Sequence, residues 1–244
     1  MEHTHASSEA PPERVSIPVL PVRILQVFVS PAKLFDAIRE RPAWLGAVVG
    51  LVVLGAAVQL LTPVVVPEDV RRAMFESQIG RFIPPGADPE LLEQQVESAM
   101  SQGPAAGVAT VVIATPIFLS LIAGLILIAF NVIMGGEGRF RQLFSAAAHA
   151  TYVSTAGGIV GLALMTLGSQ TPILTPGLFL PEVEGFIGGF LNGINIFSVW
   201  TCGVLGVAVS RIYPERSAAA GTTYLLVLYL LVVAVFAALA GLMG

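Results

Sequence analysis

Charged residues are scarce in this chain. Only 28 of its 244 residues are Asp, Glu, Lys or Arg, which is 11%, whereas soluble domains carry about 25%. Five stretches have no charge at all, and together they cover 159 residues: 42–67, 98–136, 142–181, 185–210 and 217–244. The elements of a soluble core need a polar face toward water, so this segregation of charge excludes a soluble globular domain.

The chain has one cysteine and no excess of positive charge. The single cysteine, Cys202, cannot form a disulfide within the chain, and no Cys/His spacing typical of a zinc site occurs. The net charge of −4 and the pI near 5.4 provide no basic surface for nucleic acid. Residues 1–42 contain no apolar segment followed by a small-residue cleavage site, so we expect the first span to act as an uncleaved anchor.

Long apolar runs are what the sequence does contain. A helix needs about 20 apolar residues to cross the hydrocarbon layer, and each charge-free stretch is long enough. The sequence therefore predicts an all-α, polytopic helical membrane protein with a transmembrane domain at 43–244. Five spans are expected, at about 43–66, 105–134, 144–167, 190–212 and 218–243. Pro172, Pro176 and Pro181 predict an irregular connection before the fourth span, and Pro116 predicts a bend in the second.

The positive residues predict the orientation. With five spans, nine of the 12 Lys and Arg residues fall on the side of the N-terminus, and three (Arg71, Arg72 and Arg81) fall on the other. The positive-inside rule then places the N-terminus in the cytoplasm and the C-terminus outside. In a bacterial cell the membrane would be the plasma (inner) membrane.

The N-terminal segment is predicted to lie on the cytoplasmic side. Residues 1–21 contain four prolines and are expected to be disordered. Residues 22–42 are predicted to form an amphipathic interfacial helix, with Ser30 as N-cap and an apolar face of Leu34, Phe35 and Ile38. A docking surface for a cytosolic partner is the alternative. The candidate partner or lipid-interface residues are Pro31, Lys33, Phe35, Arg39, Arg41 and Trp44.

The loop between the first two spans, residues 67–104, is acidic. It holds seven acids against three arginines. Two helices are expected, with a break at 84–86 and with Asp88 and Pro89 at the start of the second. Since no calcium-ligand spacing is present, we interpret the loop as an external helical hairpin that sits on the bundle.

Ionisable residues are almost absent from the predicted spans. No Asp, Glu, Lys or Arg lies in them, which counts against ion-coupled transport. His149 and Tyr152 share a helical face and are expected to form an interhelical hydrogen-bonding pair, with a functional proton site at His149 as the alternative. Other polar side chains are expected to join helices. The candidate intramembrane polar contacts are Pro116, Asn131, His149, Tyr152, Asn195 and Trp200.

Catalytic chemistry is not indicated. No nucleophile lies in a pattern with a base, and no metal or cofactor motif is present, so we expect no enzyme, no cofactor and no metal. Glycines spaced by four residues predict close helix packing, either within the bundle or in a homo-oligomer. These pairs are Gly46 and Gly50, Gly157 and Gly161, and Gly189 and Gly193.

Three segments carry a family resemblance. They are VFVSPAKLFDAIRERPAW (27–44), MGGEGRFRQLFSAAAHATY (134–152) and LNGINIFSVWTCGVLGVAVSRIY (191–213). Together with five spans and a long acidic loop, they resemble the Yip family, membrane proteins named for interaction with Ypt/Rab GTPases, and specifically its bacterial-type members. The family's cytosolic N-terminus agrees with the charge count. Residues 1–30 lack the acidic-Gly-Pro signature of the eukaryotic proteins, so the resemblance does not extend to Rab binding.

The resemblance and the residues together favour a non-enzymatic membrane adaptor or scaffold concerned with membrane organisation or trafficking. Its partners would be membrane lipids and other membrane or cytosolic proteins, contacted through 22–42 and 67–104. A transporter or channel component is the alternative, with His149, Asn195 and Trp200 lining a polar cavity.

Overall fold

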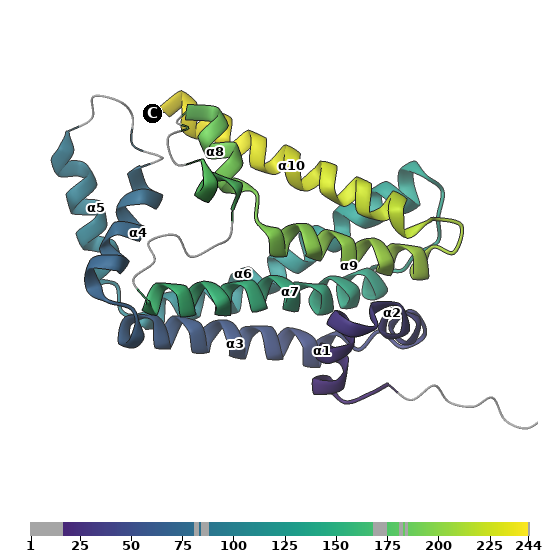
Figure 1. Ribbon diagram of the computed structural model, residues 1–244. Helices are drawn as coiled ribbons and strands as arrows, with labels where there is room; N and C mark the ends of the chain where they lie inside the picture. The colour runs from purple at the N-terminus through teal and green to yellow at the C-terminus, as the bar shows by residue number, and fades with distance from the viewer. Residues whose placement is uncertain are drawn as a thin grey trace, which may run out of the picture.

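The computed structural model describes residues 17–80, 83, 88–167, 175–180, 183 and 185–243. All regular elements in these ranges are helical, which confirms the expected all-helical fold for this part of the chain (Figure 1). The elements are α1 (Leu20–Val29), α2 (Pro31–Glu40), α3 (Trp44–Val65), α4 (Glu68–Gly80), α5 (Pro89–Ser101), α6 (Pro104–Leu127), η1 (Ile128–Ile133), α7 (Phe140–Thr166), η2 (Pro176–Phe179), α8 (Gly185–Gly193), α9 (Ile196–Ile212) and α10 (Ala218–Met243). Residues 1–16 of the predicted disordered segment 1–21, the break at 84–86, and Pro172 and Pro181 lie outside the described residues. The end of the predicted disordered segment is instead helical, since Leu20 and Pro21 begin α1.

Long apolar helices form the body of the molecule. Helix α7 contacts α3, α6 and α9, and α10 contacts α9. Among the described residues, four helices are long and apolar enough to cross a membrane: α3, α6 with η1, α7 and α10. Helices α8 and α9 meet at 55° and would together make a fifth span. Four or five spans of this kind are the architecture of a polytopic membrane protein.

The predicted fourth span is not one straight helix. It is broken between Gly193 and Ile196, where the Asn195 side chain accepts a 2.8 Å hydrogen bond from the backbone N–H of Phe197 and so caps α9. Tyr229 of α10 satisfies the exposed backbone at the break, because its hydroxyl donates to the Gly193 carbonyl (2.8 Å) and accepts from the Asn195 N–H (2.9 Å). These bonds allow a bent backbone to persist within an apolar bundle.

Helix α6 continues through Pro116, where the sequence predicted a bend. The helix is irregular at its C-terminal end, where Ile128–Ile133 form a π-helix. Gly135, with φ of +72°, then allows the chain to turn toward α7.

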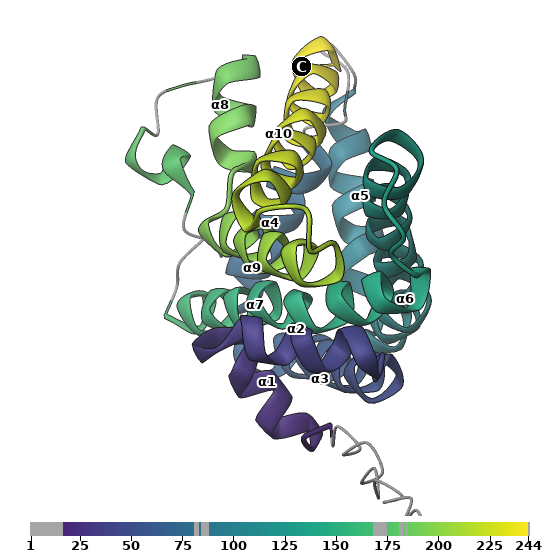
Figure 2. The same ribbon diagram turned by 90° about the vertical axis from the view of Figure 1, so that its right-hand side faces the viewer.

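The range 22–42 forms two helices rather than the expected single helix. Helix α1 ends before Ser30, whose φ of −154° is extended, since the residue before a proline is disfavoured in the helical region. Ser30 precedes α2, but its side chain makes no capping hydrogen bond. Helix α2 lies across one end of the bundle and contacts α9 and α7 (Figure 2).

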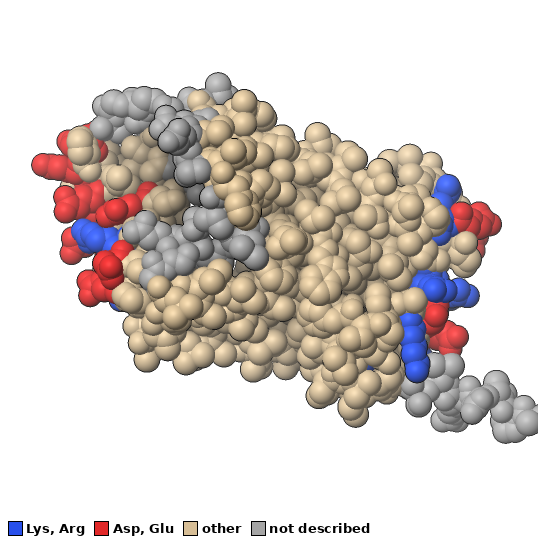
Figure 3. All heavy atoms as spheres, in the orientation of Figure 1, with Lys and Arg blue, Asp and Glu red and all other residues tan. Residues whose placement is uncertain are grey.

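The α4–α5 hairpin lies at the opposite end of the bundle. The Asp88 carboxylate accepts a 3.0 Å hydrogen bond from the Glu90 N–H and caps α5, as the sequence predicted. Val70 of α4 packs with Val66 and Met165, which joins the base of the hairpin to α7. In Figure 3, charged residues gather at the two ends of the bundle, mostly acidic at the hairpin end and of both signs at the α2 end, with an uncharged band between them.

Glycines mark the close contacts between helices. A Cβ atom added at any of three of them would press on a side chain of the neighbouring helix. The contacts are Gly50 of α3 with Tyr152 of α7, Gly157 of α7 with Phe197 of α9, and Gly193 of α8 with Val233 of α10. All three therefore serve packing within the bundle.

Candidate functional site

A buried polar cluster joins α1 to the bundle. Nη1 of Arg23 donates to the Ala43 carbonyl (2.7 Å) and lies 3.0 Å from Nε2 of His149. Nδ1 of His149 lies 2.7 Å from the Ser145 carbonyl. Because a guanidinium can only donate, Nε2 is the acceptor, and the imidazole is neutral with its proton on Nδ1. Burial lowers the pKa of the Arg23 guanidinium from its ordinary value.

Tyr152 extends this cluster by one turn of α7. Its hydroxyl donates to the Ala47 carbonyl of α3 at 2.9 Å. His149 and Tyr152 do share a face, as the sequence predicted, but each bonds a different neighbour rather than the other. His149 is fully buried and bonded at both ring nitrogens, so the geometry offers no water-accessible site for proton transfer.

Arg23 is the residue that sequence reasoning missed. It was counted among the positive charges facing the cytoplasm, yet only 8% of it is exposed. One signal was available, since Arg23 is the single charged residue in the apolar sequence LPVRILQVFV of α1.

A second polar cluster centres on Asn131, within the π-helix. The Asn131 amide donates to the Gly138 carbonyl (2.7 Å), and its oxygen accepts from the Gly138 N–H (3.2 Å) and from the Tyr213 hydroxyl (2.6 Å). Asn131 therefore joins the turn at 134–139 to the end of α9. Burial raises the pKa of Tyr213 to about 12.

The outer side of α2 is a charged surface, which we call the α2 platform and define as residues 31–44. Lys33, Arg39 and Arg41 are exposed, while Pro31 and Trp44 are half-buried. Phe35 is fully buried with Leu34 and Ile38, which corrects its assignment as a lipid-interface residue: the apolar face of α2 packs on the bundle and not into lipid.

The platform is attached to the bundle by polar contacts. The Gln142 amide donates to the Arg39 carbonyl (2.6 Å), and Nη1 of Arg39 donates to the Arg211 carbonyl (3.3 Å). Arg211 also forms an ion pair with Asp36 at 3.7 Å. Edge-on stacking of Trp44 on Phe144 adds an aromatic contact at 5.6 Å between ring centroids.

Trp200, which the sequence predicted to join helices, brings α9 into contact with α1. It is 45% exposed, and its ring meets the edge of Phe28 at 5.6 Å. The Asn195 side chain accepts a hydrogen bond from the Phe197 N–H within the helix break.

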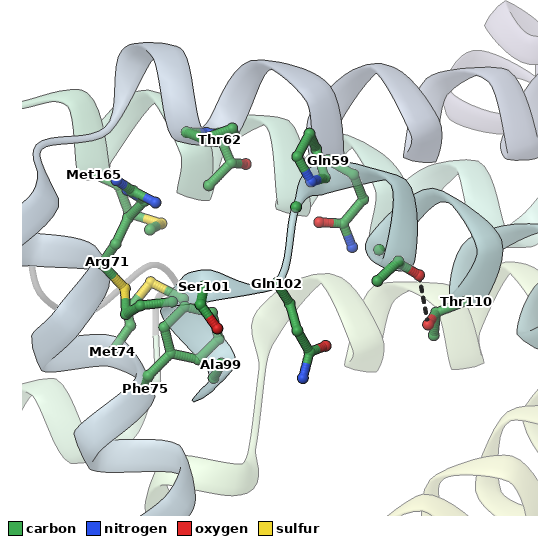
Figure 4. Close-up of a pocket in the computed structure, with 16 residues that line it drawn as sticks. Gln59, Thr62, Arg71, Met74, Phe75, Ala99, Ser101, Gln102, Thr110 and Met165 are labelled. Carbon is green, nitrogen blue, oxygen red and sulfur yellow. Dashed lines mark hydrogen bonds between the residues drawn. The ribbon is translucent and has the colours of Figure 1, made fainter. Parts of the chain in front are cut away.

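A pocket of about 410 Å³ lies between the α4–α5 hairpin and the ends of α3 and α6. In Figure 4, Arg71, Met74 and Phe75 of α4 face Gln59 and Thr62 of α3 across the opening. Gln102 and Thr110 line it near the start of α6. Within the described residues, no group of three or more His, Cys, Asp or Glu side chains is placed to hold a metal ion.

The apolar spanning helices, with charged residues gathered at the two ends of the bundle, define a multi-pass integral membrane protein. Comparison with known families matches residues 25–237 to the Yip1 domain, and the chain belongs to the Yip1 domain family. This family is one of membrane proteins and is not known for enzymatic activity. Comparison with curated proteins and with solved structures gives no match.

Proposed function

We propose that the protein is a non-enzymatic membrane adaptor that presents the α2 platform to a peripheral partner, in membrane organisation or trafficking. The observation that carries this proposal is the two-faced packing of α2. Its apolar side chains Leu34, Phe35 and Ile38 are fully buried, while Lys33, Asp36 and Arg39 are exposed. A helix held in this way is a rigid base for recognition and pays little ordering entropy on binding.

The charge at this end of the molecule favours an acidic partner surface. Residues 31–43, 134–143 and 211–217 carry seven positive and four negative side chains. Positive residues so arranged attract acidic proteins and anionic lipid headgroups, and the attraction weakens as salt increases.

The proposed topology follows from the same charges. We place the N-terminus in the cytoplasm and the C-terminus outside, in the plasma membrane of a bacterial cell, and count α8 with α9 as one of five spans. Nine positive residues against three support this orientation. The platform then faces the cytoplasm, and the hairpin faces the outside.

A photo-crosslinking amino acid at position 33 tests the adaptor function. We expect crosslinking in native membranes to capture one reproducible partner, and Arg39→Glu to reduce the yield several-fold. Glu40→Lys is the matched control, because it changes an exposed charge of opposite sign on the same helix and should not reduce the yield. The same crosslinker at Val53, 60% exposed in α3, reports contacts made by the span. Equal products from positions 33 and 53, or none from 33, would contradict the adaptor function.

A transporter or channel component is the second candidate, and the broken α8–α9 segment favours it. Discontinuous helices within a bundle form the substrate sites of many transporters. Flux of ions and small solutes into proteoliposomes tests this candidate, with Asn195→Ala as the variant. If no flux is observed, or if Asn195→Ala and His149→Ala leave the flux unchanged, these residues do not line a transport pathway.

A further inference from the structure

Arg71 differs from its neighbour Arg72 in its partners. Arg72 pairs with Glu76 (3.5 Å) and Glu93 (3.8 Å). Arg71 lines the pocket, its Nε is buried without an acceptor, and within the described part of the chain no carboxylate lies within 4 Å of it. A buried guanidinium N–H without an acceptor is costly, so the pocket is suited to a ligand that brings a negatively charged oxygen.

An apolar groove on α6 lies next to the pocket. The groove has a volume of about 540 Å³ and runs from Ala109 and Thr110 to Leu121, past Ile113 and Ile117. Thr110 lines both the pocket and the groove. Twelve residues of helix rise by about 18 Å, so the groove leads from the end of the span well into the hydrocarbon layer. A polar recess joined to an apolar track fits a molecule with a charged head and a long hydrocarbon tail.

The polar side chains of the pocket indicate which kind of charged head group it suits. The described side chains around the pocket include no Asp or Glu, so an ammonium group would find no charged partner there. Gln59 and Gln102 offer amide donors and acceptors that suit hydroxyl groups. The Gln59 side chain fits against Gly107, where an added Cβ would lie 2.9 Å from its amide carbon.

We propose that this pocket binds an anionic phospholipid of the phosphatidylglycerol type, with its phosphodiester on Arg71 and one acyl chain along α6. Bound there, the lipid would join the hairpin to α3 and α6. This site lies at the opposite end of the bundle from the α2 platform and is independent of the adaptor function.

Native mass spectrometry of the full-length protein, delipidated and then offered equal amounts of phosphatidylglycerol and phosphatidylethanolamine, tests the proposal. We expect the wild type to retain phosphatidylglycerol preferentially. Arg71→Gln should weaken this retention by about tenfold, since it removes a charge-assisted contact to the phosphate. Arg72→Gln is the matched control, because the adjacent arginine is already paired and should leave retention unchanged. Equal retention by Arg71→Gln and Arg72→Gln, or equal binding of the two lipids, would overturn the proposal.

Two further variants separate lost binding from lost folding. Arg71→Lys keeps the positive charge and should retain most of the preference. Ala114→Phe fills the groove while leaving Arg71 intact, and should weaken phosphatidylglycerol retention without affecting Arg71. Glycerol phosphate without acyl chains should not compete; full competition would show that the pocket takes a free phosphate and would contradict a lipid ligand.

Discussion

The guanidinium of Arg23 on α1 donates to the imidazole of His149 on α7, with 3.0 Å between Nη1 and Nε2. Neither side chain is open to solvent, since Arg23 is 8% exposed and His149 is fully buried. The contact spans 126 residues of sequence, and it fixes the N-terminal helices to the bundle. Within the described part of the chain, both acceptors of this buried charge are neutral, the Ala43 carbonyl and the imidazole.

Arg23→Met should destabilise the protein by about 2 kcal/mol, because it leaves the buried Nε2 of His149 without a donor. His149→Phe should cost a similar amount, because it leaves the guanidinium with one acceptor fewer. Unfolding in mixed detergent, followed by circular dichroism, measures both. The double variant should cost less than the sum of the two, since the residues share one interaction. Arg141→Met changes an exposed arginine of α7 and is the control, expected to be silent. Strict additivity of Arg23→Met and His149→Phe would show that the contact contributes no coupling.

Gly50→Ala should destabilise the protein by about 1–3 kcal/mol, because the added methyl group would overlap the Tyr152 hydroxyl. The overlap forces Tyr152 away from the Ala47 carbonyl, which accepts its hydrogen bond at 2.9 Å. Thermal unfolding in detergent measures the effect. Gly124→Ala is the matched control, since an added Cβ on α6 meets nothing within 4 Å, and a gain in helix propensity is expected there.

Tyr152→Phe provides a rescue for the same contact. Without its hydroxyl, the ring leaves room for the methyl group, so Gly50→Ala should cost less in a Tyr152→Phe background than in the wild type. If Gly50→Ala is as well tolerated as Gly124→Ala, α3 and α7 do not pack as closely at Gly50 as described.

Tyr213 should make stability sensitive to alkaline pH. Its pKa is raised from 10.0 to about 12 by burial, so folding favours the protonated phenol. This contribution is fully present below pH 10, where the unfolded phenol is also protonated, and it is lost as the pH rises through 12. Stability of the wild type should therefore fall between pH 10 and 12 more steeply than that of Tyr213→Phe. Near pH 7 the variant should be about 1 kcal/mol less stable, because Asn131 loses a hydrogen-bond donor. Parallel pH profiles for the two proteins would contradict this assignment.

Features that depend on composition along the chain could be predicted from the sequence. The charge-free stretches and the Asp88-Pro89 pair predicted helices close to α3, α7 and α10, and predicted the start of α5. These signals are local, since hydropathy and capping depend on residues within a few turns of each other. The break before α9 was also locally encoded in Asn195, but an apolar run gives the same hydropathy whether its helix is straight or bent.

Contacts between distant segments could not be predicted in this way. A lone arginine near the N-terminus is expected at the surface. The burial of Arg23 depends on its contact with His149, which lies 126 residues later in the sequence. Phe35 has the position of a lipid-facing residue on an amphipathic helix, and the same pattern arises when the apolar face packs on protein. The Arg71 pocket likewise combines residues from α3, α4 and α6 that no spacing in the sequence connects.

Cysteine labelling tests the proposed topology at positions that the structure shows to be exposed. Native Cys202, which is buried, is first replaced by Ala. Cysteines at Gln95 in the hairpin and at Phe179, which is 79% exposed, should then react with a membrane-impermeant maleimide in intact cells. Gly177 is unsuitable, because an added side chain there would overlap Asn192.

Cysteines at the exposed positions Lys33, Glu137 and Glu215 should react only after the membrane is permeabilised. The asymmetry of nine positive residues against three is expected to dominate insertion, so all three should share one side. Glu137 and Glu215 are the decisive pair. They flank the segment containing α7, α8 and α9, which returns the chain to the same side only if α8 and α9 cross the membrane once. Labelling of Glu215 but not of Glu137 in intact cells would show that α8 and α9 do not form a single crossing, and the five-span topology would be wrong.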